Sequence, residues 1–157
     1  MSPARGLVNQ KLYHSAILQR LLAAELSRQE IPQAALLEAV GESVQGQLRD
    51  AYGWFMLELA GAEAMPSRPP RDVSQLIEQQ DLQMPLSGEL VELLELEQRV
   101  GWLAQLLASE TSTLQREISS IDNLASAASR WTPELLQLWH QELTELIDRM
   151  SHSLEEW

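Results

Sequence analysis

Apolar residues in this sequence recur at alternating steps of three and four, the spacing that places side chains on one face of an α-helix. One series near the C-terminus consists of Leu136, Trp139, Leu143, Leu146, Met150 and Trp157. A second series consists of Leu93, Leu96, Val100, Leu103 and Leu107. Series of this kind line the helix contacts of left-handed bundles, and no segment alternates with period two for long enough to predict a strand. The pattern predicts an all-α fold.

Helix-capping residues and prolines mark where the predicted helices begin and end. These signals predict helices over residues 3–29, 32–61, 72–80 and 87–107, and from residue 132 to the C-terminus. The apolar period of the fourth helix continues weakly to Ile118, so its end is open. We expect one domain over residues 1–157, built as an antiparallel bundle of four long helices plus one short helix.

Three features of the first half carry further expectations. The middle of the first helix is apolar almost all round, which predicts that other helices surround it. Four glycines occur in the second helical segment, at positions 41, 46, 53 and 61. They indicate close helix–helix approach, with a ligand lying against bare backbone as the alternative. Residues 65–71 contain three prolines and are expected to form an extended, exposed linker.

The net charge of -12 is unevenly distributed. Residues 1–71 hold seven acidic and seven basic side chains, whereas residues 72–157 hold sixteen acidic groups and four arginines. An acidic surface repels nucleic-acid phosphate and anionic lipid, so we expect neither partner. A basic protein remains a possible partner of the acidic half, although such charge also serves solubility. The chain lacks cysteine, a signal peptide pattern and a membrane-spanning apolar stretch, which together favour the cytoplasm.

No sequence motif for catalysis or for cofactor binding is present. The Glu-x-x-His pairs of di-metal bundles, the His-Glu-x-x-His zinc motif and the glycine-rich phosphate loops are all missing. The Gly-x-Ser-x-Gly nucleophile motif is also missing. We therefore predict no catalytic residue, no metal site and no cofactor.

The best candidate for a ligand site is a polar group of residues on the first helix together with one histidine of the last. The group consists of Asn9, Lys11, Tyr13, His14 and His140, with Gln10 and Glu142 nearby. Lysine and histidine can carry out acid–base chemistry once burial and neighbours tune their pKa values. The alternative is a polar helix face, or a buried hydrogen-bond network that fixes how the helices pack.

The segment Asn9-Gln10-Lys11-Leu12-Tyr13 is followed by an apolar helix and then by the glycine- and aromatic-rich run Tyr52-Gly53-Trp54-Phe55. This layout resembles a family of small all-helical bacterial proteins of unknown function. The resemblance implies a bacterial cytoplasmic protein and provides no catalytic residue.

Two strong helical seams without catalytic motifs favour a non-enzymatic protein that binds a partner protein or a second copy of itself. One alternative is a small-ligand binder or enzyme that uses the Asn9–His14 face. Another is an acidic mimic of nucleic acid that blocks a basic protein.

Overall fold

The computed structural model describes residues 2–108 and 130–155 and forms six helices within them. Their bounds are α1 Pro3–Arg28, α2 Gln33–Leu59, α3 Val73–Gln80, α4 Gly88–Gln98, α5 Trp102–Leu107 and α7 Pro133–Glu155. The described residues contain no strand. The predicted all-α class is confirmed.

Side-chain caps start four of these helices as the sequence predicts. The side chains of Ser2, Asp72, Ser87 and Thr132 each accept a hydrogen bond from the backbone N–H three residues further on. Such caps satisfy N–H groups that have no partner inside the helix. At the other end of α1, Gln29 takes the left-handed conformation with φ 57, a common way for a helix to end.

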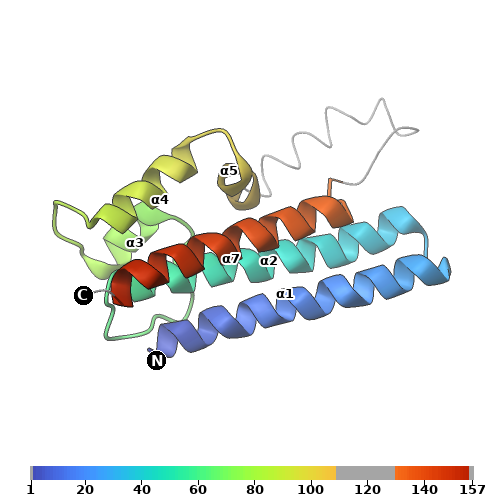
Figure 1. Ribbon diagram of the computed structural model, residues 1–157, viewed down its shortest axis with the longest axis horizontal. Helices are drawn as coiled ribbons and strands as arrows, with labels where there is room; N and C mark the ends of the chain where they lie inside the picture. The colour runs from blue at the N-terminus through green and yellow to red at the C-terminus, as the bar shows by residue number, and fades with distance from the viewer. Residues whose placement is uncertain (1, 109–129, 156–157) are drawn as a thin grey trace.

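The helices form three layers (Figure 1). The middle layer is α2 with α7, α1 packs against both of them from one side, and α3, α4 and α5 lie on the other side. Figure 1 also shows that α2 and α7 run in the same direction, opposite to α1. The described residues therefore form three long helices and three shorter ones, which differs from the expected antiparallel bundle of four long helices.

The predicted helix over residues 87–107 is broken, and this prediction was wrong. Helix α4 ends at Gln98, the backbone of Arg99 is extended, and α5 begins after Gly101. The turn lets α4 pack on α2 and α3 while α5 packs on α2 and α7, which one straight helix would not reach. As a result Val100, predicted in the apolar series, is 99% exposed, whereas Leu93 and Leu103 are buried. The weak continuation to Ile118 falls outside the described residues.

Helix α1 is less enclosed than its sequence predicts. Only four of its residues are buried, namely Ala4, Val8, Ser15 and Leu22. Tyr13 and Leu21 are 66% and 54% exposed. Among the described helices, α1 packs mainly against α2 and α7, which cover one side of it. The expectation that other helices surround α1 is therefore wrong.

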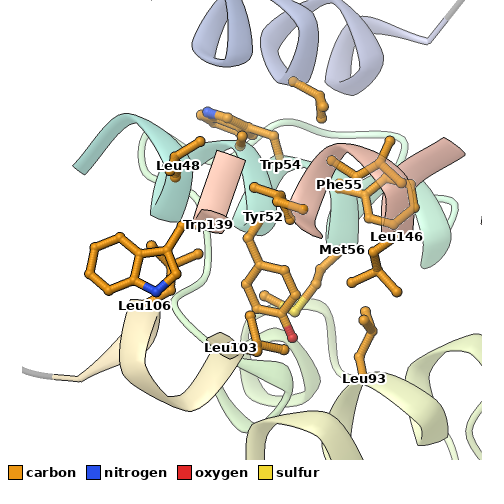
Figure 2. Packing of buried hydrophobic residues seen from close by; sticks show 14 of the residues in the cluster. Leu48, Tyr52, Trp54, Phe55, Met56, Leu93, Leu103, Leu106, Trp139 and Leu146 are labelled. Atoms are coloured by element: carbon orange, nitrogen blue, oxygen red, sulfur yellow. The ribbon is translucent and has the colours of Figure 1, made fainter. Parts of the chain in front are cut away.

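Helix α2 is the enclosed helix, since every residue from Ala51 to Leu57 is buried. Figure 2 shows the Trp54 ring on the side of α2 that faces α1, and the Tyr52 ring on the opposite side, toward α4 and α5. The Tyr52 hydroxyl donates to Glu97 Oε2 at 2.5 Å, and the Val73 N–H donates to the same oxygen at 3.0 Å. Burial raises the pKa of the Glu97 carboxyl, against the lowering effect of these two hydrogen bonds.

The apolar series of α7 faces this core as predicted. Its members Leu136, Trp139, Leu143, Leu146 and Met150 are all buried, while Trp157 lies outside the described residues. Among the described helices, none combines the length and apolar character needed to cross a membrane.

The proline segment, residues 65–71, lies against α2 and is not the fully exposed linker that its composition predicts. Pro70 is buried, although Ser67 and Arg68 are exposed. A Cβ placed on Gly53 of α2 would lie 2.3 Å from the Pro70 carbonyl oxygen and 2.7 Å from Pro69 Cβ. The segment therefore packs directly on the helix backbone, which only glycine permits at this position.

A second glycine of α2 has a similar role. A Cβ on Gly41 would lie 2.4 Å from Cγ of the Trp131 ring. The Trp131 Nε1–H donates to Gln45 Oε1 at 2.9 Å, so the ring is held in this place. Close helix–helix approach is therefore the wrong explanation for Gly41 and Gly53, because a tryptophan ring and a proline segment occupy the space that they leave.

Candidate functional site

The five predicted site residues do not form one site. Asn9 and Tyr13 are exposed and His14 is partly buried. Lys11 is directed toward α2, where its Nζ lies 3.7 Å from Asp50 Oδ2. His140 lies against α1, but its partner there is a serine that sequence reasoning did not select.

That partner is Ser15, a fully buried serine on α1. Its Oγ is 2.9 Å from His140 Nδ1 and accepts a hydrogen bond from Gln19 Nε2 at 3.0 Å. Burial lowers the pKa of the His140 imidazole, which favours the neutral form in this contact. No substrate can reach a hydroxyl with no exposed surface. The arrangement therefore matches the alternative of a buried polar network that fixes the packing of α1 on α7.

Lys11 leads instead to a cavity of about 630 Å³ between α1, α2 and the proline segment. Its lining consists of Leu7, Gln10 and Lys11 from α1, Gly46, Arg49, Asp50 and Trp54 from α2, residues 67–71, and Leu107 from α5. Ligand cavities in proteins typically span roughly 300–1,000 Å³, so this volume suits a small molecule.

The charge of the cavity is opposite to that of the chain. Four cationic side chains line it, from Lys11, Arg49, Arg68 and Arg71, against the single carboxylate of Asp50, which leaves a surplus of three positive charges. The chain as a whole has a net charge of -12. A concave surface of one charge sign concentrates its field and attracts ligands of the other sign.

The four cations differ in their contacts. The Arg49 Nε donates to the Leu106 carbonyl at 2.8 Å, and its Nη2 donates to the Ala108 carbonyl, at the C-terminal end of α5. A cation is favoured there because a helix C-terminus carries partial negative charge. Arg68 and Arg71 flank the prolines that pack on Gly53. Neither of these two arginines forms an ion pair with a carboxylate among the residues that the structure describes.

Two more polar groups line the cavity, the carboxyl of Asp50 and the indole of Trp54. Burial raises the pKa of the Asp50 carboxyl, and the neighbouring Lys11 opposes this shift. Trp54 is 7% exposed, yet its Nε1–H has no hydrogen-bond partner within the described parts of the chain.

Sequence reasoning found Lys11 and missed the three arginines. A signal for them exists, because all four cations come from residues 1–71, the half whose charges balance. Two of the arginines also lie in the proline segment, where packing onto α2 could not be foreseen. The open face at Gly46 agrees with the alternative explanation of the glycines, since a Cβ there would meet nothing within 4 Å.

Within residues 2–108 and 130–155, no group of three or more histidine or carboxylate side chains could hold a metal ion. The cavity lining contains a lysine and an aspartate, but no histidine and no serine paired with a base. The arrangement provides charge and shape for binding.

Comparison with known proteins adds a family and nothing about activity. No curated protein and no solved structure matches this sequence. The sequence matches one family model along its whole length, residues 1–157. The chain therefore belongs to DUF6586, a family of unknown function.

Proposed function

We propose that this protein is a non-catalytic binding protein for a small organic anion, held in the cavity between α1, α2 and the proline segment. The observation that carries the proposal is the surplus of three positive charges in a cavity of a chain whose net charge is -12. The four cations of the cavity repel one another, so their grouping has an electrostatic cost that an anionic ligand would offset.

The chemistry of the lining supports an organic anion over a bare inorganic one. Arginine presents a planar fork of N–H donors that matches carboxylate and phosphate oxygens. The same lining includes apolar surface from Leu7, Trp54 and Pro69, which an inorganic ion would leave unused. A ligand with one anionic group and one apolar group would contact both kinds of surface.

The test is calorimetric titration of the full chain with two organic anions, benzoate and phenyl phosphate, at low salt. We expect at least one of them to bind, and the double variant R68Q/R71Q to bind it about tenfold more weakly. R20Q is the matched control, because Arg20 is an exposed arginine of α1 outside the cavity. Absence of binding by both anions, or equal binding by the double variant, would overturn the proposal.

A second candidate function, docking of another protein or of a second copy, is favoured by the outer face of α1. Tyr13 and Leu21 on this face are 66% and 54% exposed, and Leu138 of the neighbouring α7 is 44% exposed. Large apolar side chains in such positions often contribute to interfaces. Sedimentation of the wild type against Y13E/L21E tests this candidate, since a real interface would dissociate in the variant.

A further inference from the structure

The geometry points to a phosphate monoester with a flat apolar group as the ligand, its phosphate held by Arg68 and Arg71 and its apolar group against Trp54. This inference rests on the proposed function and narrows the class of anion.

The charge surplus favours a dianion over a monoanion. A carboxylate would neutralise one of the three surplus charges, whereas a phosphate monoester carries close to two negative charges above its second pKa of about 6. The remaining surplus is then small. Phosphate also offers three terminal oxygens, which suits two arginines on one group.

The donors that remain available are those of the proline segment. Arg49 already donates to the carbonyls of Leu106 and Ala108, so it contributes charge more than new hydrogen bonds. Lys11 is paired with Asp50, whose carboxylate lies 3.7 Å from its Nζ, so part of its charge is already offset. Arg68 and Arg71 are exposed and have no carboxylate partner among the described residues. Their guanidinium groups are the ones that an incoming phosphate can engage.

Two features indicate where the apolar group lies. The Trp54 ring is on the side of α2 that faces α1 (Figure 2), and Trp54 lines the cavity. A flat group lying over the part of the ring that lines the cavity would bury apolar surface of both groups. Gly46 lines the same cavity and a Cβ on it would meet nothing, so bare helix backbone leaves room for a flat group.

The experiment compares phenyl phosphate with its parts by calorimetry on the full chain, at about pH 8 where the phosphate is a dianion. The parts are inorganic phosphate, benzoate and benzyl alcohol. We expect phenyl phosphate to bind about tenfold or more tightly than each of the three. Equal binding by inorganic phosphate or by benzoate would overturn this inference but leave the proposed function standing, whereas absence of all anion binding would overturn both.

Two variants test the position of the apolar group. W54F replaces the indole by a smaller ring, and we expect about fivefold weaker binding of phenyl phosphate with binding of inorganic phosphate unchanged. G46L places a side chain in the cavity, starting from a Cβ that meets no neighbouring atom within 4 Å, and we expect it to abolish phenyl phosphate binding, with the unfolding temperature measured beside it to show that the variant folds.

S43L is the matched control for G46L, because Ser43 is an exposed residue of the same helix outside the cavity. We expect it to bind phenyl phosphate like the wild type. Wild-type binding by both W54F and G46L would show that the apolar group does not lie at this position, and would overturn the inference.

Discussion

Gly46 and Gly53 lie two turns apart on the same face of α2, and their surroundings are opposite. At Gly53 the proline segment covers the backbone so closely that a Cβ would lie 2.3 Å from the Pro70 carbonyl oxygen. At Gly46 a Cβ would meet nothing within 4 Å, because this position lines the cavity. One face of one helix is therefore closed at one end and open at the other.

Helix α1 also has a closed and an open position about one turn apart, at Ser15 and Lys11. Ser15 is fully buried and bonded to His140 and Gln19, with every partner in place. Lys11 faces the cavity with a loose contact to Asp50. The closed positions therefore stabilise the fold, whereas the open positions carry charged groups that lack a close partner.

Among the variants at closed and open positions, we expect G53L and G46L to differ most in the free energy of unfolding. At Gly53 the new side chain would meet backbone and proline, so we expect a loss of about 3 kcal/mol or more in the free energy of unfolding. At Gly46 the same change meets open space and gains about 0.8 kcal/mol of helix propensity. Urea denaturation of both variants measures the contrast, and similar losses in the two would contradict the division of α2 into a closed and an open end.

A second closed position predicts a smaller loss. In G41A the new methyl group would lie 2.4 Å from Cγ of Trp131, so the ring has to shift. We expect a loss of about 2 kcal/mol, within the usual range for overpacking, and a change in the near-UV circular dichroism of tryptophan. If G41A were as stable as the wild type, Trp131 would not be packed on α2 as described.

The buried contact on α1 predicts a dependence of stability on pH. The pKa of His140 is below its ordinary value of 6.5 in the folded chain, so the unfolded chain binds this proton first. The contribution is full above pH 6.5 and is lost as the pH falls through the lower folded pKa. The stability is lost because burial disfavours the charged imidazolium in the folded chain.

Denaturation at several pH values gives the difference in free energy of unfolding between the wild type and H140Q. This difference separates the contribution of His140 from that of the carboxylates, which both proteins share. H14Q is the control, since it replaces a histidine on α1 and leaves the Ser15–His140 hydrogen bond in place. A wild type and an H140Q variant that lose stability in parallel as the pH falls would contradict the prediction.

The smallest expected effect is a gain. G46A adds only a methyl group to the open end of α2, so we expect about 0.8 kcal/mol of stabilisation from helix propensity and a rise of roughly 2–3 °C in Tm. Phenyl phosphate binding should persist, because a methyl group is small beside a cavity of about 630 Å³. A lower Tm would show that this position is not open.

Much of the helical layout could be predicted from local chemistry. Ser2, Asp72, Ser87 and Thr132 cap helices because their side-chain oxygens reach backbone N–H groups three residues away, a relation contained in the sequence itself. The apolar series of α7 is buried for the same reason, since a straight helix keeps its register. Such features depend on neighbours only a few residues apart.

The break at Val100 and the cavity depend on contacts between distant residues. The spacing around Val100 is compatible with a continuous helix, and only the need of α4 and α5 to pack on different neighbours breaks it. Likewise, Lys11 could be selected as a polar residue on an apolar helix. The packing of Pro70 on Gly53 brings Lys11 into one cavity with Arg49, Arg68 and Arg71. No local sequence pattern specifies this packing.

The opposed charges of the cavity and of the whole chain have a kinetic consequence. At a distance an approaching anion meets the field of a chain with a net charge of -12, and only near the cavity does it meet three surplus positive charges. Added salt screens the distant repulsion first, over a Debye length of about 8 Å at physiological ionic strength. For such an anion, moderate salt would speed association even as it weakens the contact finally made, the reverse of ordinary electrostatic steering.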